Sequence, residues 1–150
     1  MEVSGMAGHL IRRLHQISTH VFSSRMQEAG FDLTPVQFAA LDALNASPGL
    51  DQAGIAAKIA CDRATTGGVI DRLERKGLIL RQVSKRDRRS KEVLVTTEGR
   101  GIYEKILPIA SFVQSEILAG LDPKEREDFM RLAEKTIHFS DSSLAKSPCI

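Results

Sequence analysis

Apolar residues near the N-terminus follow the spacing of one helix face. Between Met6 and about Glu28 they recur at intervals of four, three and four residues, at Leu10, Leu14, Ile17 and Val21. A seam as narrow as this is typical of a helix that packs lengthwise against another helix. Gly30 ends the pattern, so a first helix is predicted before it.

Capping residues divide the following stretch into three shorter helices. Thr34, Asp51 and Asp62 each precede an apolar helical pattern, and Thr34 is followed by proline and by a glutamine three residues later. The predicted helices cover residues 35–45, 52–60 and 63–76. The positions expected on their buried faces are Ile55, Ala56, Ile59 and Ala60 in the second helix and Val69, Ile70 and Leu73 in the third.

Two short β patterns come next, at residues 78–83 and 92–96, and predict a hairpin with a long charged turn. Helical patterns return at 97–119 and 123–139. The polar residues 140–150 are predicted to form a flexible tail. With 150 residues, of which 42% are hydrophobic and 27% charged, the chain has the size and composition of one globular domain.

Positive charge is concentrated on the predicted hairpin and the helix before it. Between Arg72 and Lys91 there are nine Lys and Arg against two acids, although the whole chain carries a net charge of only +2. Such a local positive field on a mildly acidic body favours a surface that binds a polyanion. Runs of charge are also found on ordinary solvated surfaces, so charge alone leaves the partner open.

The order helix, turn, helix and hairpin is the layout of a winged helix-turn-helix. Its second helix fits the major groove of duplex DNA, and a basic hairpin beside it reaches phosphates or the minor groove. We therefore predict a mainly α-helical fold with a small β-hairpin wing, in which residues 33–97 bind double-stranded DNA. A winged helix used only for protein contacts is the alternative, but that role does not need the basic cluster.

The flanking segments 6–32 and 98–139 are predicted to be dimerisation helices. Their apolar residues exceed what a thin monomer can bury. In the second segment these are Ile102, Ile106, Ile109, Phe112, Val113 and Ile117. The pattern therefore predicts a homodimer.

Candidate DNA contacts lie at the start of the helix 63–76 and on the wing. These side chains have donors suited to phosphates and base edges: Arg63, Thr65, Thr66 and Arg72 on the helix, and Arg86, Arg88, Arg89 and Lys91 on the wing. Arg72 and Arg75 are expected either to flank the groove or to be neutralised by Asp71 and Glu74 on the helix surface. Gly67 and Gly68 each cost about 1 kcal/mol inside a helix. They predict a close approach of this backbone to DNA or to the preceding helix.

Asp87 is the single acid among the cations of the turn. It can accept a bidentate hydrogen bond from an arginine and fix its direction, or it can cap the turn through its own backbone. The residues leave both interpretations open.

Residues 63–81 (RATTGGVIDRLERKGLILR), followed by Asp-Arg-Arg at 87–89 and Val-Thr-Thr-Glu-Gly at 95–99, resemble the MarR family of bacterial winged-helix regulators. The family pattern is Leu-x-x-x-Gly-Leu-Ile-x-Arg, then a wing with Asp-x-Arg, then Leu-Thr-x-x-Gly. It maps onto Leu73, Gly77, Leu78, Ile79, Arg81, Asp87, Arg89, Thr96 and Gly99. Val95 replaces the leucine before the threonine.

The resemblance implies a ligand-responsive repressor that binds a pseudo-palindromic operator as a homodimer with interlocked terminal helices. It also implies that Asp87 pairs with Arg89, whose side chain enters the minor groove. A small organic effector between the dimerisation and DNA-binding parts is implied as well. The candidate pocket residues are His15, Phe22, Arg25 and Phe38, although aromatic residues at this spacing are also ordinary core.

Other classes of protein find little support. No apolar run approaches the ~18–20 residues of a membrane span and no signal peptide is visible, so we expect a cytoplasmic protein without a membrane partner. No nucleophile–base motif or phosphate-binding glycine loop is found, and an enzyme is not expected. No metal or cofactor is expected either, although His15 and His20 lie five residues apart on one predicted helix. Cys61 fits a small buried hydrophobe, with redox sensing as the alternative.

Overall fold

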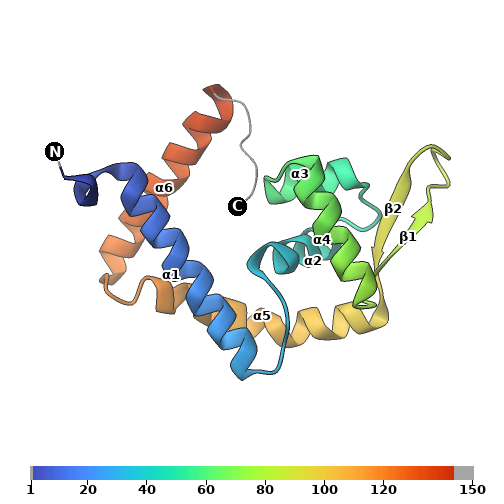
Figure 1. Ribbon diagram of the computed structural model, residues 1–150, viewed down its shortest axis with the longest axis horizontal. Helices are drawn as coiled ribbons and strands as arrows, with labels where there is room; N and C mark the ends of the chain where they lie inside the picture. The colour runs from blue at the N-terminus through green and yellow to red at the C-terminus, as the bar shows by residue number, and fades with distance from the viewer. Residues whose placement is uncertain (1, 144–150) are drawn as a thin grey trace.

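Residues 2–143 are described by this computed structural model, and they form a set of α-helices with one β-hairpin (Figure 1). In chain order the elements are a 3-10 helix η1 (Val3–Gly5), α1 (Ala7–Glu28), α2 (Pro35–Ala46), α3 (Gln52–Ile59), α4 (Arg63–Arg75), β1 (Ile79–Val83), β2 (Lys91–Val95), α5 (Thr97–Ile117) and α6 (Pro123–Ser143). The predicted mainly helical fold with a β-hairpin wing is confirmed.

The helix caps predicted from the sequence are present in the structure. The Gln37 amide donates to Thr34 Oγ1 at 3.2 Å while the Thr34 amide donates to Gln37 Oε1 at 3.3 Å, which completes a capping box. Asp51 and Asp62 each accept the amide of the third residue after them at 2.7 Å. Each of the helices α2, α3 and α4 therefore begins where a side chain satisfies its first amides.

Two helix ends differ from the prediction. α3 ends at Ile59, and Ala60 takes a left-handed φ of 57°, so Ala60 is exposed instead of lying on the buried face. The turn is closed by the Cys61 amide, which donates to Ala56 O at 3.0 Å. Cys61 itself is 4% exposed.

The second difference is that α6 continues to Ser143, although its end was predicted near Phe139 with a flexible tail at 140–150. Polar side chains here bond back to helix carbonyls: Ser142 Oγ donates to His138 O at 2.9 Å. A polar composition therefore does not end the helix. Residues 144–150 of the predicted tail, Cys149 among them, lie outside the described residues.

The wing is an antiparallel hairpin attached to the helical core. Its register pairs Ile79 with Val95 and Val83 with Lys91. The Val93 amide also donates to Leu50 O at 2.9 Å, so the segment before α3 supports β2 from its other side. Beneath the hairpin, α2, α3 and α4 share a fully buried centre that contains Leu41, Ile55, Ile70 and Leu73.

α5 runs beneath α2 and α4 and connects the hairpin to α6, with α1 packed against it (Figure 1). α1 and α6 keep apolar side chains exposed. These are Leu10, Ile11, Leu14 and Ile17 on α1 and Met130, Leu132, Ile137 and Phe139 on α6. Residues of both helices line an apolar groove of about 370 Å³, among them Ile11, Leu14 and Leu132. Within residues 2–143, no helix combines the length and the apolar character needed to cross a bilayer.

Gly99 sets the junction between the wing and α5. A Cβ at this position would overlap the carbonyl group of Leu78 and lie 3.0 Å from Val95 Cγ1. Because the obstacle is backbone, we expect Gly99→Ala to lower the free energy of unfolding by at least roughly 2 kcal/mol in denaturant titrations. Gly101→Ala in the same helix meets nothing within 4 Å and should raise it by about 0.5–1 kcal/mol. Equal effects of the two substitutions would contradict this account.

Candidate nucleic-acid interface

The first turn of α4 is fixed by Asp62 and faces solvent. The Asp62 carboxylate accepts the Thr65 amide at 2.7 Å and the Thr65 hydroxyl at 3.0 Å. The hydrogen bond from the Thr65 backbone holds the pKa of Asp62 below its ordinary value, because it favours the charged form. Arg63 is exposed and Thr65 is half-buried. Both are therefore at the surface, with the Thr65 hydroxyl already engaged by the cap.

The prediction that Thr66 binds DNA is wrong. Thr66 is 0% exposed, and its hydroxyl donates to Asp62 O at 2.7 Å. It lies three and four residues before Val69 and Ile70, which places all three side chains on the same buried face of the helix. Its short side chain stays on that face because the Asp62 carbonyl satisfies its hydroxyl.

Gly67 leaves room for the preceding helix. This agrees with one of the two close approaches that the glycine pair predicted. A Cβ on Gly67 would lie 3.0 Å from Gln52 Nε2 of α3. The same amide donates to Arg63 O at 3.1 Å, so Gln52 ties the start of α3 to the start of α4. A Cβ on Gly68 would meet only the end of the Arg72 side chain, at 3.7 Å. No pattern in the sequence indicates the role of Gln52, because its partner is a backbone carbonyl in the next helix.

The acids of α4 pair with the wing instead of with the arginines of their own helix. Arg81, from β1, forms an ion pair with Asp71 and lies 4.0 Å from Glu74 Oε2. Arg72 is exposed and makes no ion pair among the described residues. It is therefore available at the surface of the helix.

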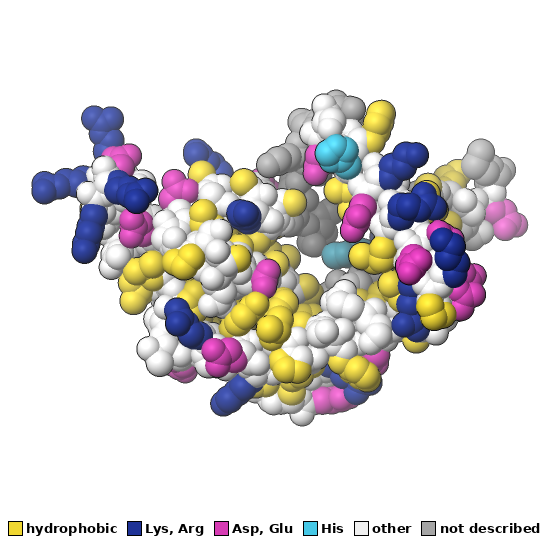
Figure 2. Space-filling view, turned by 180° about the vertical axis from the view of Figure 1, so that it is seen from behind, with side chains coloured by type: hydrophobic (Ala, Val, Ile, Leu, Met, Phe, Trp, Pro, Cys, Tyr) yellow, Lys and Arg dark blue, Asp and Glu magenta, His cyan; other side chains and the backbone are white. Residues whose placement is uncertain are grey.

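The predicted wing cations project from the end of the molecule. Arg86, Arg88, Arg89 and Lys91 are all exposed. In Figure 2 the side chains of Lys and Arg gather on the wing tip, at the left edge of the view, where they extend away from the body. The tip is thus the most strongly positive projection of the face shown.

Ser84 organises the backbone of this tip and was missed by the sequence analysis. Its side chain is 7% exposed, and Ser84 Oγ accepts the amides of Arg86 at 3.2 Å and Asp87 at 3.3 Å. The hydroxyl donates to Glu92 Oε1 at 3.2 Å. A serine at the end of a strand, two residues before a charged turn, is the only available signal, and it is weak.

Asp87 caps the turn. Its Oδ1 accepts the amide of Arg89 at 2.9 Å, and its carbonyl accepts the amide of Ser90 at 3.1 Å. The carboxylate is bonded to the amide of Arg89 and not to its guanidinium. Of the two interpretations left open by the residues, the structure supports the backbone cap.

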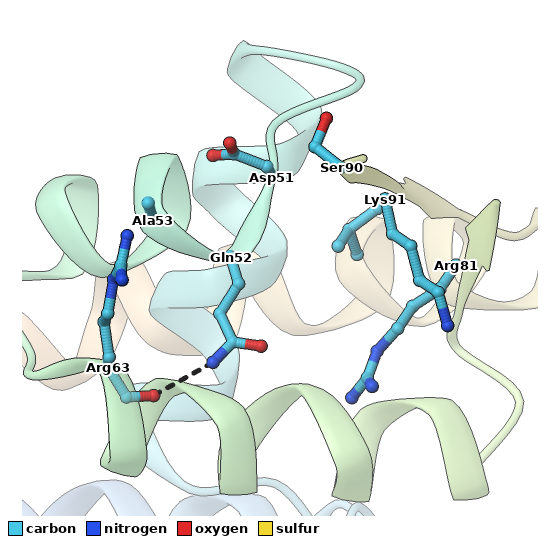
Figure 3. Close-up of a pocket in the computed structure, with 8 residues that line it drawn as sticks. Asp51, Gln52, Ala53, Arg63, Arg81, Ser90 and Lys91 are labelled. Atoms are coloured by element: carbon cyan, nitrogen blue, oxygen red, sulfur yellow. Dashed lines mark hydrogen bonds between the residues drawn. The ribbon is translucent and has the colours of Figure 1, made fainter. Parts of the chain in front are cut away.

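A hollow of about 330 Å³ separates the start of α4 from the wing (Figure 3). Gln52 lies between Arg63 on one side and Arg81 with Lys91 on the other. Asp51 and Ser90 complete the polar part of the lining. Three cations from α4, β1 and β2 thus face one open space.

The predicted effector residues are only partly brought together. The rings of Phe22 and Phe38 are 6.1 Å apart, and Phe38 stacks on Tyr103 at 5.7 Å. Tyr103 donates to Asp42 Oδ1 at 2.6 Å, and this bond, together with burial, raises the pKa of Tyr103 to about 12. His15 is exposed on α1. The aromatic residues therefore join α1, α2 and α5, as ordinary core residues also do.

Arg25 faces α5. It donates to both carboxylate oxygens of Glu116, at 2.6 and 2.7 Å, and to Glu28 at 2.9 Å, and its guanidinium lies 5.7 Å from the ring centre of Phe112. These hydrogen bonds raise the pKa of Arg25 and lower the pKa of Glu116. Arg25 is thus a charged link between α1 and α5 in this conformation.

The chain is similar to bacterial transcriptional regulators. Residues 33–91 match the sequence model of the MarR family. Transcriptional regulator HosA of Escherichia coli O127:H6 is 31% identical over 138 residues, which cover 92% of this chain and 99% of HosA. The solved structure of BpsR from Bordetella bronchiseptica, whose DNA binding is regulated by 6-hydroxynicotinic acid, has a TM-score of 0.84 at 31% identity, covering 91% of this chain and 96% of BpsR. Transcriptional repressor CouR, solved bound to a 23-mer DNA duplex, has a TM-score of 0.78 at 28% identity, covering 91% of this chain and 95% of CouR.

The effect of the hydrogen bond that Asp87 accepts can be separated from the effect of its negative charge. Asp87→Asn keeps an oxygen that accepts the Arg89 amide, whereas Asp87→Ala removes it. We expect hydrogen exchange of the amides in the turn 84–90, followed by NMR, to be unchanged in the asparagine variant and severalfold faster in the alanine variant. Faster exchange in both variants would show that the negative charge, and not the accepted hydrogen bond, orders the turn.

Proposed function

The chain belongs to the MarR family of transcriptional regulators, and from this premise we propose that it is a ligand-responsive repressor that binds a pseudo-palindromic operator as a homodimer. One observation carries the DNA-binding part of the proposal: Arg63 of α4 and Lys91 of the wing line the same hollow. The helix start and the hairpin therefore face one surface, where a single duplex meets both.

Each element suits a different groove of that duplex. The first turn of α4, with Arg63 exposed and Thr65 at the surface, enters the major groove. The tip of the wing carries Arg86, Arg88 and Arg89, and an arginine there gains from the concentrated negative potential of the narrower minor groove. Arg72 is exposed further along α4 and contacts phosphate. The structure of CouR bound to a 23-mer DNA duplex supports duplex binding by a chain of this fold.

The homodimer is supported by the apolar surface of α1 and α6. Leu132 is 51% exposed, Ile137 60% and Phe139 70%, and a monomer would leave this surface in water. Packing of 6–32 and 98–139 against the same segments of a second copy would cover it. A two-fold dimer presents two copies of α4, and this symmetry is what a pseudo-palindromic operator matches.

We further propose that the effector is a small aromatic acid held near the junction of α1, α2 and α5. Phe22 and Phe38 offer aromatic faces, and Arg25 offers a guanidinium that already binds a carboxylate, that of Glu116. A ligand acid there takes the place of the Glu116 carboxylate on the guanidinium, and the released Glu116, whose side chain is 26% exposed, is hydrated by solvent. His15 lies two turns before Phe22 on the same side of α1 and forms the outer edge of this site. The regulation of BpsR by 6-hydroxynicotinic acid supports a ligand of this class.

The alternative, a winged helix that contacts only proteins, is less favoured. Protein contacts alone do not require exposed cations on both the wing and the start of α4. A catalytic role is not part of the proposal, and a regulator that acts on operators works in the cytoplasm.

Selection of genomic fragments bound by the full chain tests the function, and a pseudo-palindromic sequence is expected to be enriched. With the selected duplex, we expect Arg89→Ala to lose roughly 1–3 kcal/mol of binding free energy and to lower the salt dependence, measured by anisotropy titrations at several salt concentrations. Lys105→Ala, which removes an exposed charge of α5, is the matched control. Unchanged affinity in Arg89→Ala would refute the role of the wing. Failure to enrich any sequence would favour the protein-contact alternative.

The dimer is tested by sedimentation equilibrium. We expect a species of twice the 16.5 kDa chain mass at micromolar concentration. Leu132→Glu places a charge on the apolar face of α6 and should shift this species towards monomer, because an unpaired charge is costly in an apolar interface. Leu80→Glu, at a leucine of β1 that is 41% exposed, should leave the dimer intact. A wild-type monomer under these conditions would remove the dimer from the proposal.

A further inference from the structure

Glu92 is an acid beside the most basic turn of the chain. Five cations lie at positions 85–91, yet Glu92 makes no ion pair among the described residues. Its half-buried side chain instead accepts a hydrogen bond from Ser84, whose Oγ donates to Glu92 Oε1 at 3.2 Å. A negative charge at this place repels the phosphates that the wing cations attract. Its presence on the wing therefore calls for a role other than charge.

The hydroxyl of Ser84 has one proton and two lone pairs. Its oxygen accepts the amide of Arg86 at 3.2 Å and the amide of Asp87 at 3.3 Å, so both lone pairs are used by the turn. The proton must then point away from these amides, and the carboxylate of Glu92 is its acceptor. Ser84 is 7% exposed, so water has little access to replace that acceptor. Glu92 thus fixes the direction of the hydroxyl, and the hydroxyl fixes the start of the turn.

Glu92 acts from the side of β2 opposite the hollow that α4 and the wing enclose. Lys91 and Val93 line that hollow, whereas Glu92 lines a second one of about 560 Å³, beside the loop that precedes α3. Successive side chains of a strand point to opposite faces, so the two hollows lie on opposite sides of β2. A Cβ on Gly49 of the loop would lie 3.9 Å from Glu92 Cδ, and Gln82 Nε2 of β1 lies 3.5 Å from Glu92 Oε2. The carboxylate is therefore held between the loop and β1.

We propose that Glu92 is a positioning residue for DNA binding, which acts through Ser84 on the backbone of the turn 85–89. The inference rests on the proposed function and adds to it a residue that itself contacts no DNA. The turn lies outside β1 and β2, so the hairpin ladder does not order it. A loop that holds its bound conformation for only a fraction of the time loses apparent affinity by that fraction. With Glu92 in place the turn is ordered before DNA arrives, and binding costs less conformational entropy.

Charge and positioning predict opposite results for one substitution. Glu92→Met removes both the negative charge and the acceptor, whereas Glu92→Gln removes the charge and keeps an oxygen for the Ser84 hydroxyl. A role through charge alone would make both variants bind the selected operator more tightly than wild type. A positioning role makes Glu92→Met bind roughly two- to tenfold more weakly, while Glu92→Gln binds at least as tightly as wild type. Anisotropy titrations with the selected duplex measure both affinities.

Ser84→Ala tests whether Glu92 acts through this hydroxyl. Alone it should weaken binding by a similar factor, and adding Glu92→Met to it should cause no further loss. Hydrogen exchange of the Arg86 and Asp87 amides, followed by NMR, should be severalfold faster in Glu92→Met and unchanged in Glu92→Gln. Gln82→Met is the matched control, because it places a methionine at the cross-strand partner of Glu92. It should change neither the affinity nor the exchange.

Three results would overturn the positioning role and leave the proposed function standing. The first is unchanged or tighter binding by Glu92→Met, and the second is a further loss when Glu92→Met is added to Ser84→Ala. The third is equal weakening in Glu92→Gln and Glu92→Met, which would assign the effect to the charge. Equal thermal unfolding of all variants excludes a loss of fold. Failure of wild type to bind any selected duplex would remove the proposed function and this inference with it.

Discussion

The hydrogen bond from Val93 N to Leu50 O, 2.9 Å long, holds the wing to the segment that leads into the DNA-binding helices. In the proposed function, α4 and the wing enter neighbouring grooves, and they can do so together only at a fixed separation. Val93 is 2% exposed, so loss of this bond would leave a buried donor unsatisfied, at a cost of about 1–3 kcal/mol. The ion pair of Arg81 with Asp71 spans the same joint, but its side chains are 26% and 50% exposed, and such pairs contribute only ~0–1 kcal/mol. The backbone bond and the core beneath it therefore set the spacing.

Local signals predicted the elements well, because a helix cap is satisfied within a few residues. Thr34, Asp51 and Asp62 each bond to the amide three residues later, and the sequence alone contains that relation. Helix ends were less predictable. Ala60 adopts a left-handed conformation that glycine usually takes, since the amide that follows it needs a carbonyl of the preceding turn. No residue type in this segment indicates that the helix ends here.

The candidate site was predicted in part from the sequence. The contacts that were not predicted join residues far apart along the chain. The sequence placed the cations correctly on α4 and the wing, but it could not pair atoms that are far apart along the chain. Asp71 was expected beside an arginine of its own helix and instead meets Arg81 of β1. Thr66 was expected at the surface, although its spacing from Val69 already placed it on the buried face. The helical position of Thr66, which is available in the sequence, therefore decides its burial and outweighs its polar residue type.

Electrostatics links these local arrangements to the approach of DNA. Of the 21 Lys and Arg in the chain, nine lie between residues 72 and 91, where only two of the 19 acids are found. The remaining surface is therefore net negative, and a duplex is attracted to the wing and repelled elsewhere. Beyond about 10 Å this attraction is screened at 0.1 M salt, so it orients the protein only during close encounter. In the proposed function, the charge asymmetry selects the face that meets DNA, and the fixed spacing of α4 and the wing decides which grooves that face can enter.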